Sequence, residues 1–461
     1  MAGHGLQLAP RHEPGSHHEY QHGRAPGLQS RAADRTGRSL LAGRGNQTIQ
    51  RRVRRLKQGV KLLALLLLLS LTGCWDRTEL NELSITSATA IDRKDDRWIV
   101  SYQVLIPSVV SGAMGMKGGA QLPITVYSTE GPTIRETIYQ STLESPRTLF
   151  FSHNRVVIIG EELAKSGGLE ELIDVYFRNS DSRETVAVLI TKGEGRRILE
   201  QLMQIQIIPG DGIRETIRTE RKDFSALPFI NMYKLAMEMT SEAKNAVIPE
   251  IYISGGAPVT SADQMNKTTM TSKLKLGRLA VLREGRLAGW LEIKQALGAN
   301  FLRNQVKSTV MSLGCGKGES SKESAIKIIN ASTRVKPVLQ GEGEPIRMKV
   351  DIKAEGTLLE TNCKADLDKP DTIKGIEKQL EGEISEVVRN GFEETQKLKA
   401  DIVGFADLIH RKHPKQWKKM KADWPERYSQ IQLETKVDFT LKRLGLTSKS
   451  FKKMIEEGDD S

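Results

Sequence analysis

Cysteine is scarce in this chain, whose 461 residues include three: Cys74, Cys315 and Cys363. Three cysteines are too few for a disulfide framework. If Cys74 serves another purpose, Cys315 and Cys363 remain, and they could form one disulfide. We expect instead two free, partly buried thiols, because unpaired cysteine behaves as a small hydrophobic residue in protein cores.

Long apolar runs are also missing. The most apolar segment, Leu62–Leu71, has about half of the roughly 20 residues that a helix needs to span a bilayer. Polar residues return at Trp75-Asp76-Arg77. The sequence therefore disfavours a plain transmembrane helix at this position.

No catalytic constellation is recognisable. His410 and His413 share the spacing of one helix face, but no third ligand accompanies them. Gly316-Lys317-Gly318 lacks the hydroxyl residue of a phosphate loop. We therefore predict no catalytic residue, no cofactor and no metal site, so that the protein is not an enzyme. Three other candidates are incomplete. His153 has no nearby nucleophile, and Gly193-Glu194-Gly195 lacks a third glycine and is better explained as a helix start. Asp366, Asp368 and Asp371 lack the glycine and distal glutamate of a calcium loop.

Positive charge is concentrated at the start of the chain. The whole sequence has 69 Lys+Arg and 57 Asp+Glu, a net charge of +12. Residues 1–73 hold 12 of those cations and three of the anions, which leaves 57 against 54, or +3, for the 388 residues from Cys74 onward. A nearly neutral chain has no electrostatic reason to bind DNA or RNA, so we predict no nucleic-acid partner.

A secretory signal is the clearest motif. The segment 51–61 contains six Arg and Lys residues and precedes the uncharged run Leu62–Leu71, an arrangement typical of signal peptides. The run ends in Leu71-Thr72-Gly73-Cys74, which resembles a bacterial lipobox. The resemblance implies cleavage between Gly73 and Cys74 and thioether lipidation of Cys74 as S-diacylglyceryl cysteine, whose new amino group can also be acylated. Two acyl chains give stable anchoring, whereas one chain binds membranes only marginally.

Residues 1–52 precede this signal and contain five of the eight histidines. One interpretation is a disordered or metal-binding arm. The other is a segment that is not translated, because signal peptides begin near the amino terminus. Val53 offers an alternative start, with Arg54-Arg55-Leu56-Lys57 as a normal basic region. We favour the second interpretation and assign the signal peptide to residues 53–73.

The remaining sequence predicts an α+β protein with three consecutive mixed α/β domains, at residues 74–208, 209–318 and 319–461. Period-two apolar patterns predict an antiparallel pair at 85–92 and 98–106 in the first domain, joined by a charged turn. Glycine- and proline-rich sequence predicts a loop after residue 106 and a boundary near Pro209-Gly210. Further strands are expected at 123–128, 149–159 and 184–191, and helices at about 129–145, 163–167, 169–177 and 196–203.

The middle domain is expected to have helices at 213–224 and 230–243 and a hairpin that turns at Glu284-Gly285. In the last domain, long strands at 325–338 and 346–359 precede an amphipathic helix whose apolar face runs from Ile373 to Phe392. We expect this helix to pack on its own domain's sheet rather than form a coiled coil with a partner. Shorter helices at 405–411 and 416–421 lead to an alternating strand, 431–442, which closes an antiparallel sheet.

Four phrases of the sequence suggest a family. They are Cys74-Trp75-Asp76-Arg77-Thr78-Glu79-Leu80-Asn81; Pro146-Arg147 with Ser152-His153-Asn154-Arg155; Arg283-Glu284-Gly285-Arg286-Leu287-Ala288-Gly289-Trp290; and Asp401-Ile402-Val403-Gly404-Phe405 with Pro414-Lys415-Gln416-Trp417. Together they resemble the C subunit of spore nutrient germinant receptors, the Ger(x)C lipoproteins. The resemblance extends, in order, over nearly the whole chain after Cys74, although the leader before residue 53 is atypical.

The resemblance implies a non-enzymatic lipoprotein, required for nutrient-triggered spore germination, on the outer face of the inner membrane of an endospore. It implies two integral membrane partners, the A and B subunits, and contact with lipid through Cys74. It supplies no binding residues for a nutrient. The alternative is a lipid-anchored solute-binding protein of a transporter, which would need two doubly wound lobes.

Overall fold

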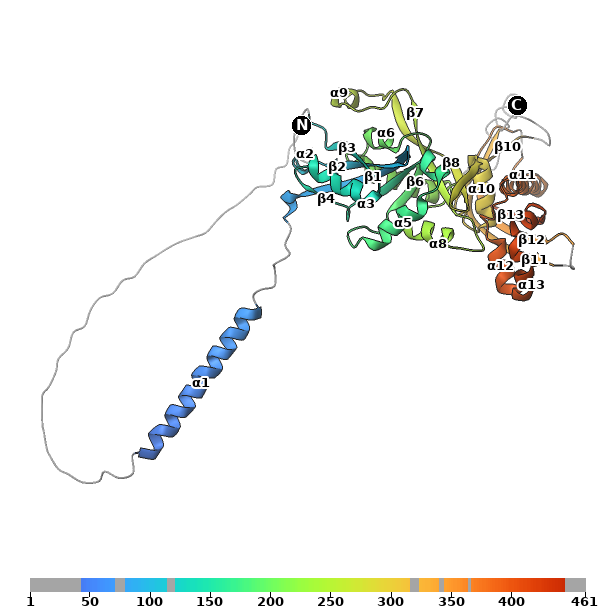
Figure 1. Cartoon of the computed structure of the whole chain (residues 1–461). Helices are drawn as coiled ribbons and strands as arrows, with labels where there is room; N and C mark the ends of the chain where they lie inside the picture. The colour runs from blue at the N-terminus through green and yellow to red at the C-terminus, as the bar shows by residue number, and fades with distance from the viewer. Residues whose placement is uncertain are drawn as a thin grey trace, which may run out of the picture. The chain divides into compact units, whose positions relative to one another are not determined.

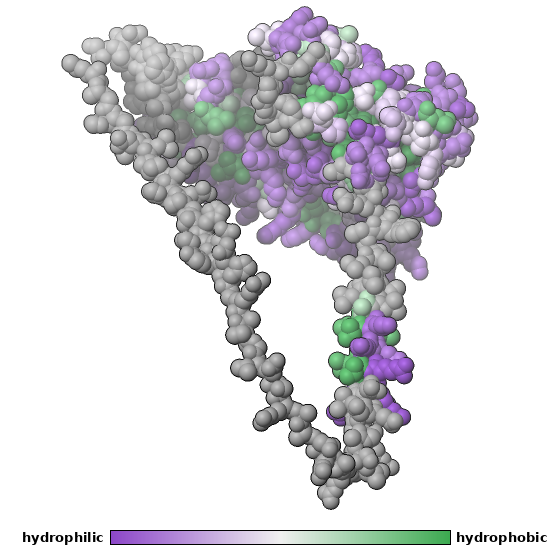
Figure 2. All heavy atoms as spheres, turned by 90° about the vertical axis from the view of Figure 1, so that its left-hand side faces the viewer, coloured by the Kyte–Doolittle hydropathy of each residue, from purple (hydrophilic) through white to green (hydrophobic). Residues whose placement is uncertain are grey.

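The computed structural model describes residues 43–70, 79–113, 121–315, 323–339, 344–363 and 366–443, with side chains of residues 51–64 only in the first range. The chain divides into two compact units, Met1–Arg77 and Thr78–Ser461. The first unit contains one described helix, α1 (Gly43–Ser70), and Figure 2 shows both hydrophilic and hydrophobic side chains along it. Among the described residues, no helix is both long enough and apolar enough to cross a membrane.

The larger unit contains a nine-stranded mixed sheet in which the strands run in the order β3-β2-β1-β5-β6-β7-β8-β9, and β4 pairs with the start of β1. The central strands β1, β5, β6 and β7 are parallel, and both edges are antiparallel hairpins. The strands are β1 (Leu83–Lys94), β2 (Arg97–Leu105), β3 (Ile124–Gly131), β4 (Thr148–Phe150), β5 (Val156–Gly160), β6 (Ala187–Thr191), β7 (Val247–Gly255), β8 (Ser272–Arg283) and β9 (Arg286–Leu291).

The sequence explains why the parallel strands are central. Val156–Gly160 and Ala187–Thr191 are buried at every position, as expected of strands that are covered on both faces. Helices α3 and α5 cover one face and α6 covers the other (Figure 1). The helices associated with this sheet are α2 (Pro107–Ala113), α3 (Ile134–Gln140), α4 (Glu161–Ser166), α5 (Leu169–Arg178), α6 (Gly195–Glu200), α7 (Pro209–Asp223), α8 (Met232–Met239) and α9 (Ala262–Met265), with 3₁₀ turns η1 (Leu80–Glu82) and η2 (Ser141–Leu143).

A second sheet of four strands has the order β10-β11-β12-β13. Its strands are β10 (Thr309–Leu313), β11 (Ser324–Val338), β12 (Arg347–Thr361) and β13 (Gln432–Arg443), and its helices are α11 (Pro370–Lys397), α12 (Phe405–Lys412), α13 (Pro414–Met420) and α14 (Trp424–Ser429), with the 3₁₀ turn η3 (Lys421–Asp423). The α+β class is confirmed. The buried stripe Leu380, Ile384, Val388 and Phe392 also confirms that the long helix α11 packs into its own domain.

The prediction of a wholly antiparallel second sheet is wrong at one edge. Strands β10, β11 and β12 are antiparallel, but β13 lies parallel to β12, with Arg347 opposite Gln432. The segment between them contains α11 through α14, and such a long helical crossover returns the chain to the end of the sheet at which β12 began. An alternating apolar pattern identifies a strand that is buried on one face. It does not show whether that strand runs parallel or antiparallel to its neighbour.

The expectation of two free thiols is also wrong, because Cys315 and Cys363 form a disulfide with their Cα atoms 5.3 Å apart. The sheet register explains the pairing. Leu313 at the end of β10 and Thr361 at the end of β12 both pair with Ser324, the first residue of β11. Each cysteine follows the last residue of its strand by two positions. The two cysteines therefore lie close together at the same end of the sheet.

Several predicted boundaries shift. The loop expected after residue 106 begins with α2, because Pro107 suits the first turn of a helix. The helix expected from residue 129 begins instead at Ile134, capped by the Thr133 hydroxyl, which accepts the Glu136 N–H at 3.2 Å. The strand expected at 149–159 is divided into β4 and β5 by a turn. The division into three domains remains a prediction, and strands on both sides of residue 208 lie in one sheet.

Helix α10 (Ile293–Leu302) joins the two sheets. All residues from Ala296 to Leu302 are buried. Ala296 and Ala299 belong to the core of the large sheet, whereas Leu297 and Phe301 belong to the core of the small sheet. A helix that is buried all round in this way must approach its neighbours closely. It crosses α11 where Gly298 faces Gly391, and a Cβ on Gly391 would lie 3.0 Å from the Gly298 Cα.

We predict that Gly391→Ala lowers the free energy of unfolding by about 1–3 kcal/mol, the usual cost of overpacking a core. The added methyl group would overlap the backbone of Gln295 and Ala299, which cannot move away as a flexible side chain would. Urea unfolding of the purified chain measures the change.

Gly382→Ala on the same helix is the matched control, because a Cβ there meets nothing within 4 Å. It should stabilise the protein by up to about 1 kcal/mol through helix propensity. Equal effects of the two substitutions would contradict the close approach of α10 and α11.

Candidate functional site

The residues predicted for lipidation and cleavage, Gly73 and Cys74, lie outside the described residues, as does Gly316-Lys317-Gly318. The lipid site therefore stays a prediction. In the sequence, Glu79, the first described residue after Cys74, follows it by five residues.

The histidine candidates make ring contacts or connect helices. His410 stacks on Trp417 with ring centroids 6.0 Å apart, and His413 links the end of α12 to the start of α13. His153 is exposed beside Phe150. Within the described part of the chain, no group of three His, Cys, Asp or Glu side chains is placed to hold a metal ion.

The phrase that begins at Asp401 forms a helix cap. The Asp401 carboxylate accepts the backbone N–H groups of Gly404 at 2.7 Å, Phe405 at 3.1 Å and Ala406 at 2.7 Å, at the start of α12. Gly404 has a φ of 91°, which favours glycine. Burial raises the pKa of Asp401 to about 6, although these three N–H groups oppose the shift. The phrase therefore has a structural role.

Two other family phrases are also structural. Asn154 is buried and donates to Thr89 Oγ1 at 2.9 Å and Tyr176 Oη at 3.2 Å, which ties β1 to α5. Arg155 forms an ion pair with Asp211 of α7 at 2.9 Å. The phrase at 283–290 is the β8–β9 hairpin, whose turn residues Glu284 and Gly285 both have positive φ.

A charged cleft of about 610 Å³ lies beyond the end of β6. In this cleft Glu250 pairs with Arg278. The Nη2 and Nε groups of Arg278 donate to the Glu250 carboxylate at 2.7 and 3.0 Å. The Arg278 guanidinium also lies 4.3 Å from the centre of the Trp290 ring. Charged side chains of both signs complete the lining: Lys192, Glu194, Arg197, Lys275 and Glu292. Its described lining includes the hydroxyl residues Thr191 and Tyr252 but no serine, cysteine or histidine.

Asp92 lies beside this cleft, under the loop that contains Glu194. Its carboxylate accepts the Gly195 N–H at 3.0 Å, at the start of α6. Burial, with a smaller contribution from Glu194, raises the pKa of Asp92 to about 6. The carboxylate fills the space beside Gly160, where a Cβ would collide with it. Asp92 therefore fixes the α6 loop against the sheet.

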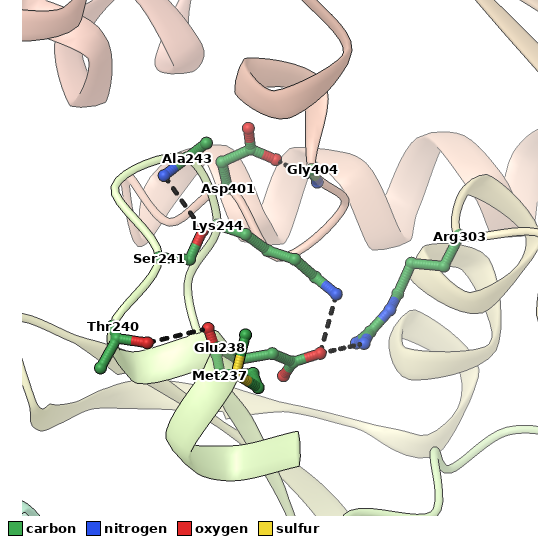
Figure 3. A network of polar contacts seen from close by, with 9 residues as sticks. All are labelled: Met237, Glu238, Thr240, Ser241, Ala243, Lys244, Arg303, Asp401 and Gly404. Carbon is green, nitrogen blue, oxygen red and sulfur yellow. Dashed lines mark hydrogen bonds and ion pairs between the residues drawn. The ribbon is translucent and has the colours of Figure 1, made fainter. Parts of the chain in front are cut away.

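The most unusual polar feature is a buried charge cluster of Glu238, Lys244 and Arg303, shown in Figure 3. The Glu238 carboxylate accepts from Lys244 Nζ at 2.7 Å and from Arg303 Nη2 at 3.0 Å. The Glu238 and Arg303 side chains are 6% and 2% exposed. The cluster joins α8, the loop before β7 and the end of α10, and Asp401 lies next to it in Figure 3. It therefore ties α8 and the loop before β7 to the end of α10.

Burial and the neighbouring positive charges have opposite effects on the pKa of Glu238. Burial alone would raise the pKa of Glu238, but Arg303 and Lys244 outweigh it and lower the pKa below the usual value. Burial lowers the pKa of Arg303 and of Lys244. Lys234 of α8, whose pKa falls to about 8 through burial and the nearby Arg303, adds a further cation. Glu238 is therefore the carboxylate paired directly with the buried Arg303 and the partly buried Lys244.

Sequence reasoning did not find this cluster. Its members are separated by up to 65 residues, and none belongs to a motif or a family phrase. The one available signal was indirect: charged residues within segments that are otherwise buried, such as Arg303 directly after Leu302.

We predict that Glu238→Gln lowers the free energy of unfolding by about 3–5 kcal/mol, because it leaves buried cations without a counter-charge. Glu242→Gln, four residues away, is the matched control. Glu242 pairs with Lys421 on the surface, and exposed pairs contribute little. Thermal and urea unfolding measure both variants, and a Glu238→Gln protein as stable as the control would show that the cluster is not buried in solution.

Two family models match the chain, one after the other. The model described as "Spore germination protein N-terminal domain" matches residues 76–253, and "Spore germination B3/ GerAC like, C-terminal" matches residues 277–445. The first range covers most of the large sheet, and the second begins in β8 and includes the small sheet.

Similar proteins match over nearly their whole length. "Spore germination protein KC" of Bacillus subtilis (strain 168) is 29% identical over 86% of this chain and 98% of its own length. YfkR of the same organism is 30% identical over 84% of this chain and 97% of its own length. A solved structure, "Crystal Structure of the GerBC protein", aligns with a TM-score of 0.48 and 16% identity over 80% of this chain and 100% of that chain. The chain belongs to the GerAC-like, or Ger(x)C, family of spore germination proteins.

Proposed function

We propose that this chain is the lipid-anchored C subunit of a spore germinant receptor and acts without catalysing a reaction. The observation that carries the proposal is the match, over almost the entire chain after Cys74, to proteins named for spore germination. The signal sequence and lipobox that end at Cys74 add an export route and an anchor.

The proposed anchor determines which part of the chain is removed and which part stays at the membrane. Cleavage after Gly73 removes the basic segment, and two acyl chains on Cys74 hold the exported part at the outer face of the spore inner membrane. Integral membrane A and B subunits are the proposed partners there. The charged cleft and the packed sheets supply rigid surfaces for such contacts, and the receptor's nutrient response would depend on the assembled complex.

A solute-binding protein of a transporter is the rival function. It would have two doubly wound lobes with ligand between them. The described residues form instead one nine-stranded mixed sheet and one four-stranded sheet joined by a buried helix. We therefore do not propose a transporter role.

We predict that Cys74→Ala abolishes incorporation of labelled fatty acid, because only the thiol accepts the diacylglyceryl group, and that it weakens nutrient-triggered germination. Thr72→Ser, which keeps a small residue before the cleavage site, is the control and should be lipidated normally. Metabolic labelling, membrane fractionation and germination assays test the pair. Normal membrane retention and a normal nutrient response in the Cys74→Ala strain would refute the proposal.

A further inference from the structure

The lipid anchor, if placed at Cys74 as proposed above, restricts which surface of the folded unit can face the membrane. Five residues separate Cys74 from Glu79, where the described chain begins again. Five residues reach at most about 18 Å when fully extended. The surface around η1, which begins at Leu80, must therefore stay close to the lipid headgroups.

Exposed apolar side chains lie on that surface. Leu143 is 85% exposed and Tyr139 is 69% exposed. They lie four residues apart across the end of α3 and the adjoining turn η2, a spacing that places two side chains on one side of a helix. Thr142, beside Leu143, lines a depression of about 560 Å³ together with Asn81 and Glu82 of η1. The apolar pair is thus next to the point where the anchored segment enters the fold.

A second depression borders the same entry point. It has a volume of about 760 Å³, and Asn81 and Arg147 line both depressions. Its other walls are mainly apolar: Ile85, Val104, Leu105, Ile106, Pro107 and Tyr127. Figure 1 shows β4 and α2 together at this end of the unit, and Figure 2, which faces it, shows hydrophobic side chains among hydrophilic ones.

The charges near the entry point indicate how this surface would contact the lipid bilayer. Glu79 and Glu82 precede β1, and Glu144 follows Leu143. Two cations lie nearby: Arg147, which lines both depressions, and Arg135, four residues before Tyr139 on α3. This balance gives no attraction toward anionic lipids. Leucine and tyrosine suit the boundary between headgroups and acyl chains, because tyrosine has an apolar ring and a polar tip.

We propose that the surface formed by Tyr139, Leu143 and the two depressions beside Asn81 is the membrane-facing side of the protein. Leu143 and Tyr139 insert among the headgroups of the bilayer to which Cys74 is anchored, and the contact depends on apolar insertion rather than on lipid charge. The anchor and this surface together hold the folded unit in one orientation. Its opposite end, with the four-stranded sheet, points away from the lipid.

The test uses the full-length lipidated chain in vesicles of neutral phosphatidylcholine. Leu143→Cys introduces a thiol for an environment-sensitive fluorophore, and quenchers attached to the lipids report contact. Leu359→Cys is the matched control, because Leu359 is an exposed leucine of β12. Figure 1 shows β12 at the other end of the unit from α3. We expect the label at residue 143 to be quenched severalfold more strongly than the label at 359, with no decrease at high salt.

Three other outcomes overturn the inference. Equal quenching at the two positions, with the protein still in the vesicle fraction, rejects the orientation and leaves the lipid anchor intact. Protection of residue 143 that requires the other membrane proteins of the spore assigns this surface to a protein partner. Protein that remains in the supernatant shows failure of the anchor itself, and with it of the proposed function.

Discussion

The close approach of α10 to α11 is the constraint on which the rest of the larger unit depends. Gly298 and Gly391 allow two helix backbones to touch, so that α10 can lie between the two hydrophobic cores and contribute to both. Without that contact α10 could not pack into both cores. The cluster of Glu238, Lys244 and Arg303 lies at the end of the same helix. Separating Glu238 from the buried Arg303 would be costly, because it would leave buried charges unpaired.

The phrases that identify the family serve this architecture. Asp401 caps α12 beside the charge cluster, Gly289 of the β8–β9 hairpin packs against Leu398 beyond the end of α11, and Asn154 links β1 to α5. None of them forms a catalytic group. The described residues of these phrases therefore form turns, helix caps and packing contacts.

The sequence predicted most strands and helices because their apolar periods are strong, as in β13 and α11. It did not predict the direction of β13, which depends on a long crossover, or the Cys315–Cys363 disulfide, which depends on the register of three strands. The charge cluster was also missed, since its residues meet only in the folded chain. The signal and lipobox remain predictions from local sequence, which need no tertiary structure to be recognised.

The central claim is that this chain works as an anchored subunit among membrane proteins. Chemical crosslinking in intact spore membranes, followed by affinity purification of the tagged full-length chain and mass spectrometry, tests it most directly. The account predicts recovery of two integral membrane proteins, the A and B subunits, crosslinked to this chain. Recovery of the chain alone, or with the permease and nucleotide-binding subunits of a transporter, would contradict it.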